Sequence, residues 1–196
     1  MTSDLPDLPP GAEGDDSAPG GAERRSRLRQ YQVQLLERMQ AAQSEAVATG
    51  RELGVLIGAR HYLLDLTQVG EIVPHHSVAA VPLTRDWYLG LANIRGNLTG
   101  IVDLARFQDE PALQPGAEAR FVTFAPALGL PCALLVSRVL GLRKLADMTA
   151  AAAEPDGAPA GAHWRAETFT DSDGLAWQRL DLALLVADPR FLHVGR

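Results

Sequence analysis

LGLANIRGNLTGIVDLARF, residues 89–107, is the most informative segment of the chain. Two apolar runs of strand character stand back to back in it, and they are joined through Arg95-Gly96-Asn97, where Gly and Asn signal a turn. We expect Gly96 and Asn97 to form this turn, so that Arg95 lies at the end of a strand. The tail that begins at Asp103 has the pattern of a helix start, because an aspartate there accepts hydrogen bonds from free backbone N–H groups. The segment predicts a β-hairpin followed by a short helix.

Short strand-like runs of this kind continue along most of the chain after Leu53. Turn residues separate them, and many short strands at close spacing are typical of a β-sandwich or a β-barrel. The runs cover residues 52–57, 61–66, 69–73, 88–95, 97–103, 121–125, 132–136, 138–143, 162–170 and 175–181. A second Asp-Leu pair at Asp181 echoes the pair at Asp103. We therefore expect two small β units, each of which ends in a short helix.

Three segments differ from this strand pattern. Residues 1–22 are rich in Pro, Gly and Asp and predict a disordered acidic tail. Residues 23–50 predict an amphipathic helix, since apolar residues recur at spacings of three and four. Two roles stay open for this helix: it packs on its own domain, or it is an arm that binds a partner. Residues 146–161 are rich in Ala, Pro and Gly and predict a surface loop inside the domain formed by residues 51–196.

The composition argues against several classes of function. The formal net charge of −6 disfavours a nucleic-acid partner, because such binding depends on clustered Lys and Arg. Cys132 is the single cysteine, so neither an internal disulfide nor a multi-cysteine zinc site can form. The N-terminus is acidic where a signal peptide would be basic, and prolines and glycines interrupt the longest apolar stretch. The sequence predicts a cytoplasmic protein with no direct membrane insertion.

Residues 88–107 carry a resemblance to a known family. The segment YLGLANIRGNLTGIVDLARF resembles the Asn, hydrophobic, Arg-Gly and later Asp-Leu pattern of the CheW family of chemotaxis coupling proteins. Three further segments are similar to the family's opening strands, to a strand pair of its second barrel, and to its closing strand and helix. They are LGVLIGARHYLLDLTQVGEIVPHHSVAAVP (53–82), PCALLVSRVLGLRKL (131–145) and GLAWQRLDLALLV (174–186). The resemblance covers residues 52–187.

The resemblance implies an all-β fold of two SH3-like five-stranded barrels, with a short helix after each barrel. It also implies an adaptor that has no catalytic activity and needs no cofactor. Such proteins connect the cytoplasmic tip of a methyl-accepting chemoreceptor to the regulatory domain of a CheA-type histidine kinase, and so are associated with membrane receptor complexes. The segments DWYLGLANIRGN and DPRFLHV are most similar to the subfamily that serves the pathway controlling type IV pili and twitching motility. A general coupling protein of flagellar chemotaxis is the alternative.

Two partner surfaces follow from the resemblance. A groove between the barrels accepts the receptor, and an apolar groove of this kind suits a helical partner. The positions of this chain that match the groove are Val69, Ile72, Arg95, Val136, Val139 and Leu140. The kinase domain docks end-on against the first barrel, and the matching positions there are Glu71, Gly90 and Arg95.

The residues themselves leave alternatives open at these positions. The planar guanidinium of Arg95 suits a carboxylate or a carbonyl of a partner, or it bonds loop carbonyls of its own barrel. Glu71 either meets the kinase or stays solvated at an edge strand. Gly90 either adopts a backbone conformation that other residues rarely adopt, or it permits another segment of the chain to approach closely.

A metal-dependent enzyme is the rival from another class of function. The residues that motivate it are His61, Asp65, His75, His76 and Asp103. None of them forms an HExxH or another metal-ligand spacing, and adjacent histidines point in different directions. The sequence also lacks a Gly-rich phosphate loop and a G-x-S-x-G segment. We therefore expect no metal and no catalysis.

Overall fold

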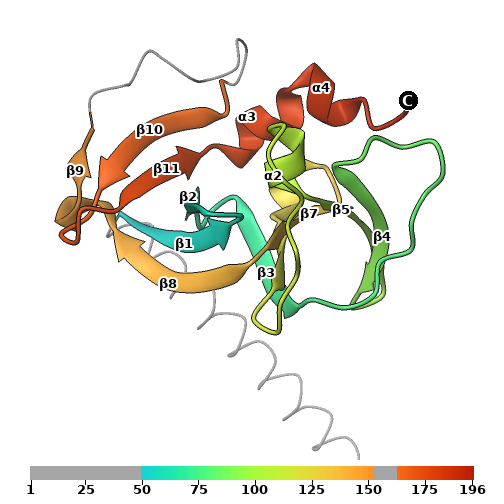
Figure 1. Ribbon diagram of the computed structural model, residues 1–196, viewed down its shortest axis with the longest axis horizontal. Helices are drawn as coiled ribbons and strands as arrows, with labels where there is room; N and C mark the ends of the chain where they lie inside the picture. Colours follow the sequence, from blue (N-terminus) through green and yellow to red (C-terminus); the bar gives the residue numbers. More distant parts are fainter. Residues whose placement is uncertain (1–49, 152–162) are drawn as a thin grey trace, which may run out of the picture. The chain divides into compact units, whose positions relative to one another are not determined.

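The computed structural model describes residues 50–151 and 163–196, which form two β-sheets with short helices beside them (Figure 1). The predicted tail 1–22, the predicted helix 23–50 up to residue 49, and residues 152–161 of the predicted loop lie outside the described residues. In the described part, no helix is long and apolar enough to cross a membrane.

One sheet holds six described strands in the order β8-β1-β2-β11-β10-β9, and the other holds five in the order β3-β6-β7-β5-β4. The strands of the six-stranded sheet are β1 (Arg51–Ile57), β2 (Arg60–Asp65), β8 (Arg138–Lys144), β9 (Thr149–Ala150), β10 (Arg165–Thr170) and β11 (Ala176–Leu180). Those of the five-stranded sheet are β3 (Val69–Pro74), β4 (Tyr88–Ile94), β5 (Asn97–Val102), β6 (Arg120–Phe124) and β7 (Cys132–Val136). The ten predicted strands are confirmed, and the all-β class with two SH3-like barrels is confirmed with them.

The grouping of the strands along the chain differs from the expectation. The chain begins the six-stranded sheet with β1 and β2, crosses to build all of the five-stranded sheet, and returns with β8. The crossing back occurs at Ser137, whose backbone N–H donates to the Leu56 carbonyl at 2.8 Å. The segment 131–145 is therefore not a strand pair of one barrel: β7 pairs with β5 and β6, whereas β8 pairs with β1. β2, from the beginning of the domain, pairs in parallel with β11, from near its end.

The short helices begin where the sequence predicts. Asp103 caps α2 (Leu104–Phe107), and Asp181 caps α3 (Leu182–Ala187), which is followed by α4 (Pro189–Leu192). One carboxylate oxygen of Asp103 accepts from the backbone N–H groups of Ala105 and Arg106, at 3.0 and 3.3 Å. The other oxygen accepts from the Leu113 N–H at 2.9 Å. The buried carboxylate of Asp103 thus satisfies three backbone donors at once.

Replacing Asp103 with alanine is expected to lower the free energy of unfolding by about 2–4 kcal/mol, because three backbone N–H groups lose their acceptor in or near the core. Asp103→Asn keeps one carbonyl oxygen and should fall between alanine and wild type. Urea denaturation of the three proteins measures the difference. An Asp103→Ala protein within about 0.5 kcal/mol of wild type would contradict this role, since that is the spread of ordinary surface substitutions.

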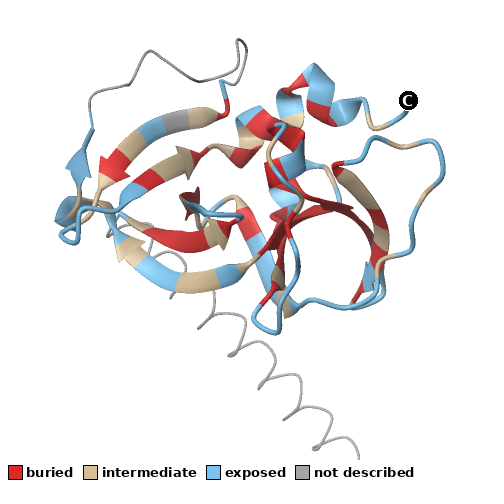
Figure 2. Cartoon of the chain, in the orientation of Figure 1, coloured by how far each residue is buried: buried red, intermediate tan, exposed pale blue. Residues whose placement is uncertain are grey.

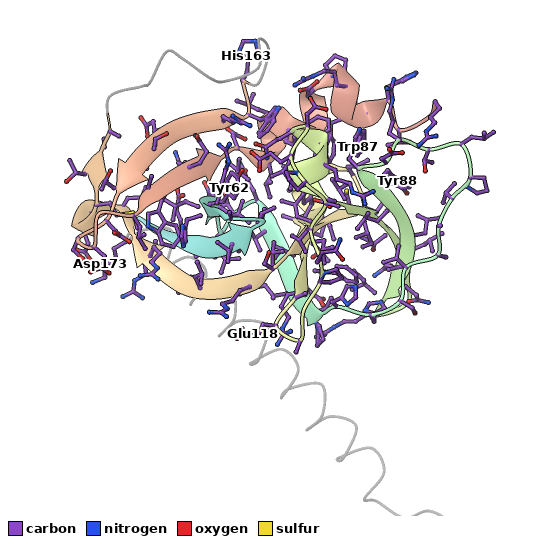
Figure 3. All side chains as sticks on the ribbon, in the orientation of Figure 1. Tyr62, Trp87, Tyr88, Glu118, His163 and Asp173 are labelled. Atoms are coloured by element: carbon purple, nitrogen blue, oxygen red, sulfur yellow. The ribbon has the colours of Figure 1, made fainter. Side chains whose placement is uncertain are left out.

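Most of the core is one cluster that takes side chains from both sheets and from the helices (Figure 2). Tyr62 of β2 and Trp87, just before β4, both belong to it (Figure 3). The Trp87 ring stacks on Phe191 of α4 with centroids 5.7 Å apart and an interplanar angle of 12°. A smaller cluster of Leu63, Phe169 and Trp177 lies within the six-stranded sheet. The shared core holds the two sheets together.

The first residues of the predicted surface loop 146–161 form regular structure. Residues Leu145–Asp147 form the 3₁₀ helix η2, and β9 then pairs with β10 as the sixth strand. Leu145 and Met148 pack on the smaller cluster, so burial of these two apolar side chains fixes the segment. The Ala/Pro/Gly composition did not indicate η2 or β9, because Leu145 and Met148 stand among residues that are typical of loops.

Candidate partner-binding site

The turn at the centre of the 89–107 segment is Arg95-Gly96. Ile94 of β4 pairs directly with Asn97 of β5, so Asn97 already belongs to the second strand. The φ angles are +50° at Arg95 and +90° at Gly96, and positive φ at both central residues is the requirement of a type I′ hairpin turn. The Asn93 side-chain oxygen accepts from the Gly96 N–H at 2.8 Å. The expected Gly96-Asn97 turn is therefore wrong by one residue, and Arg95 is inside the turn.

Arg95 forms an ion pair with Glu71 across the two ends of the five-stranded sheet. The Arg95 Nε lies 2.7 Å from the Glu71 Oε2, and the side chains are 74% and 48% exposed. Glu71 is on β3 and Arg95 follows β4, the two outermost strands of this sheet. The contact is with a carboxylate and not with a loop carbonyl. The pair thus links the sheet's two edges, while most of the guanidinium still faces solvent.

An irregularity in β3 places Glu71 for this contact. The register with β6 shifts between Val69 and Ile72, as in a β-bulge. The Glu71 backbone N–H donates to the Thr123 hydroxyl oxygen at 2.6 Å, and that hydroxyl donates to the Glu71 carbonyl at 3.2 Å. A Cβ on Gly70 would lie 2.6 Å from the same hydroxyl oxygen, so the close approach requires glycine here.

An apolar pocket of about 510 Å³ opens beside the Arg95–Glu71 pair, at the mouth of the five-stranded barrel. Its lining residues are Gly70, Glu71, Ile94, Asn97, Leu98, Thr99, Thr123, Phe124, Pro126, Gly129, Leu130, Pro131 and Cys132. They come from β3, from the β4–β5 hairpin, from the ends of β6 and β7, and from the loop that contains the 3₁₀ helix η1 (Pro126–Leu128). Sequence reasoning missed this pocket, because five separate segments build it and none has a motif of its own. We call it the barrel-mouth pocket.

Buried residues form the floor of the barrel-mouth pocket. They are Ile94, Thr99, Phe124 and Cys132. Burial raises the pKa of the Cys132 thiol to about 12, so the thiol stays protonated at neutral pH. Cys132 therefore serves as a small buried apolar residue. The Thr99 hydroxyl donates to the Asn97 carbonyl at 3.3 Å, so the floor presents mainly apolar atoms.

The structure separates the predicted groove residues into two groups. Val69 and Val136 are only 5% and 0% exposed and belong to the main core, so they cannot be the surface that a partner touches. They are corrected from contact residues to core residues, because Val136 lies on the fully buried strand β7 and the Val69 side chain packs into the main core at the start of the edge strand β3. Ile72 is 43% exposed on β3. Val139 packs on the main core and Leu140 on the smaller cluster, and both are half-buried.

Gly90 is buried and does not reach the surface that Arg95 and Glu71 share. Its φ is +129°, and a Cβ there would lie 2.1 Å from the carbonyl oxygen of Ala79. Ala79 and Leu91 exchange two backbone hydrogen bonds, at 2.8 and 2.9 Å, which hold the loop before β4 against this strand. Direct kinase contact by Gly90 is therefore corrected to a structural role: glycine makes room for the loop.

Three of the five residues considered for a metal site pack on aromatic rings, and the other two accept hydrogen bonds. His61 packs on Trp177 with ring centroids 4.8 Å apart, whereas His75 and His76 both pack edge-on against Phe121. Asp103 caps α2, and one oxygen of Asp65 accepts from the N–H and the hydroxyl of Thr67. Within residues 50–151 and 163–196, no three His, Cys, Asp or Glu side chains come together as metal ligands could.

Comparison with known proteins now adds to this geometry. The CheW-like domain family matches residues 52–190. The chain belongs to the CheW-like domain family. Protein PilI of Pseudomonas aeruginosa is 31% identical over 102 residues, which cover 52% of this chain and 57% of PilI. The match thus spans little more than half of that relative's length. The resemblance seen in the sequence is confirmed.

A solved structure shares the fold. The crystal structure of the scaffolding protein TtCheW from Thermoanaerobacter tengcongensis superimposes with a TM-score of 0.57 at 17% identity. The match covers 68% of this chain and 89% of that chain. At this identity the likeness concerns the fold alone, and it agrees with the two SH3-like barrels described above.

Proposed function

We propose that this chain is a non-catalytic adaptor that couples the cytoplasmic tip of a methyl-accepting chemoreceptor to a CheA-type histidine kinase, in a pathway that controls type IV pili. Membership of the CheW-like family supports the adaptor role, and the similarity to PilI supports the pilus output. The single observation that carries the proposal is the Arg95–Glu71 pair, since both residues stand at family motif positions and remain solvent-exposed. The proposed partners place the protein in the cytoplasm, beside membrane receptors.

Two surfaces serve the two partners in this proposal. The kinase regulatory domain meets Arg95 and Glu71 at the barrel mouth. The receptor tip meets the exposed Ile72, together with the accessible parts of Val139 and Leu140. Val69 and Val136 support these walls from the core and touch no partner.

Arg95→Lys should weaken binding of the kinase regulatory domain by about 1–3 kcal/mol, because lysine keeps the charge but loses the planar fork of donors. The free energy of unfolding should change by less than about 1 kcal/mol, since exposed ion pairs contribute little. Isothermal titration with the regulatory domain and with a receptor cytoplasmic fragment, paired with urea denaturation, measures both quantities.

Arg85→Lys is the matched control for this experiment. Arg85 is an exposed arginine on the loop before β4, and its side chain makes no hydrogen bond or ion pair within the described residues. Its replacement should leave both affinities unchanged. If the stable Arg95→Lys and Arg95→Ala proteins bind both partners as the wild type does, Arg95 has no place in the coupling site.

A further inference from the structure

The surface that we assign to the receptor takes its walls from two different sheets. Ile72 is on β3 of the five-stranded sheet, whereas Val139 and Leu140 are on β8 of the six-stranded sheet. The spacing of these walls therefore depends on the orientation of one sheet relative to the other. The shared core holds the sheets together through apolar contacts, which are not directional. Hydrogen bonds are directional, so those that cross from one sheet to the other can fix the orientation.

Gln68 crosses between the sheets at the point where the chain passes from β2 to β3. Its side-chain Nε2 donates to the Asp181 Oδ1 at 3.0 Å, and its Oε1 accepts from the Leu182 N–H at 2.7 Å. Both partners belong to the start of α3, which follows β11 of the six-stranded sheet. The Gln68 backbone carbonyl accepts from the Ala125 N–H at 2.8 Å, directly after β6 of the five-stranded sheet. Gln68 thus joins an element of each sheet.

Gln108 crosses between the sheets at a second point. It ends α2, which follows β5 of the five-stranded sheet, and it is only 9% exposed. Its Nε2 donates to the Tyr62 hydroxyl of β2 at 3.2 Å, and its Oε1 accepts from the Arg165 guanidinium of β10 (Figure 3). Both of these strands belong to the six-stranded sheet. The Arg60–Glu110 ion pair also crosses here, but the Arg60 side chain is 58% exposed, so this pair contributes little.

We infer that Gln68 and Gln108 are positioning residues, which together fix the orientation of the two sheets and so set the spacing of the receptor walls. Two separate points are required, because one point alone allows rotation about itself. The inference rests on the proposed function for its receptor, but the orientation of the sheets can be measured without any partner. The kinase surface should not depend on the two glutamines, since Arg95 and Glu71 both belong to the five-stranded sheet.

Methionine substitutions remove the amide groups and keep the length of the side chains. Gln68→Met and Gln108→Met leave an unbranched side chain whose sulfur is only a weak acceptor. The double variant removes both crossing points. Gln114→Met is the matched control, because Gln114 is exposed and its side chain makes no hydrogen bond within the described residues.

Glutamate substitutions should give opposite results at the two positions. In Gln108→Glu, the carboxylate can accept from both the Tyr62 hydroxyl and the Arg165 guanidinium, so the orientation of the sheets should be retained. In Gln68→Glu, the donor to Asp181 is lost and two carboxylates face each other, so this variant should be at least as disruptive as Gln68→Met. A general loss of polarity or stability would not produce this contrast.

The experiment measures orientation and binding on the full chain. Residual dipolar couplings of the backbone amides report the orientation of one sheet relative to the other. Titrations use a receptor cytoplasmic fragment and, separately, the regulatory domain of a CheA-type kinase. We expect the double methionine variant to show a changed orientation, to bind the receptor fragment about tenfold more weakly, and to bind the kinase domain within about twofold of wild type. Gln114→Met should match wild type in all three measurements.

Several results would overturn the inference. Wild-type dipolar couplings in the folded double variant would show that the two glutamines do not fix the orientation. A changed orientation with unchanged receptor affinity, or equal losses for both partners, would overturn the positioning role. If the double variant unfolds, the single variants and the glutamate contrast decide in the same way. If the wild-type chain binds no receptor fragment, the proposed function fails, and the dipolar couplings still test the role of Gln68 and Gln108 in orienting the sheets.

Discussion

Replacing Gly90 with alanine is expected to lower the free energy of unfolding by at least about 3 kcal/mol, a large part of the stability of an ordinary domain. Two separate costs add at this position. The φ of +129° is a conformation that essentially only glycine adopts. The new Cβ would also lie 2.1 Å from the Ala79 carbonyl oxygen, and this backbone atom cannot rotate away as a flexible side chain does. The loop before β4 must therefore detach, or the strand must distort.

Gly116→Ala is the matched control for Gly90→Ala. A Cβ at Gly116 meets no atom within 4 Å, and its φ is not in the left-handed region. Urea denaturation should place this variant within about 0.5 kcal/mol of wild type. If Gly90→Ala is equally stable, the close packing of residues 79–80 on β4 is not required in solution. A stable Gly90→Ala protein that fails to bind the kinase domain would instead restore the contact role for Gly90.

Local features of this fold were predictable because each depends on neighbouring residues. Alternating apolar residues and turn signals predict the strands, and Asp103 and Asp181 predict the helix starts through their side-chain oxygens. The turn was predicted one residue late, because the Gly-Asn pair is a common turn signal. In the structure Arg95 takes the left-handed position instead, at a cost of roughly 1–2 kcal/mol for a residue that has a Cβ.

Long-range features were not predictable from such patterns. β1 pairs with β8 and β2 pairs with β11, although long stretches of chain separate the partners, and no local signal assigns the first hairpin to these strands. The Arg95–Glu71 pair depends on the same three-dimensional arrangement, since β3 and β4 meet only when the sheet curls. The barrel-mouth pocket, built from five segments, was missed for this reason as well.

The predicted groove failed at Val69 and Val136 for a related physical reason. Apolar residues that face a partner and apolar residues that face the core look the same in a sequence, because both avoid water. In β7 all five residues are buried, so alternation does not mark an outer face (Figure 2). Only the sheet order shows why: β7 is the middle strand of its sheet, and other elements cover both of its faces.

Val136→Asp is therefore expected to unfold the protein rather than to weaken partner binding alone. A carboxylate at this fully buried position loses its hydration without a partner, and the cost of several kcal/mol approaches the stability of a whole domain. Ile72→Asp is the matched comparison, since Ile72 is 43% exposed on an outer strand and should lose at most about 1 kcal/mol of stability. Near-ultraviolet circular dichroism and urea denaturation report on folding, and titration with a receptor cytoplasmic fragment reports on binding. Ile72→Asp should remain folded and bind this fragment more weakly, because the charge lies on the wall that we assign to the receptor. A Val136→Asp protein that stays folded and selectively loses the receptor would return Val136 to the contact surface and would show that β7 opens on binding.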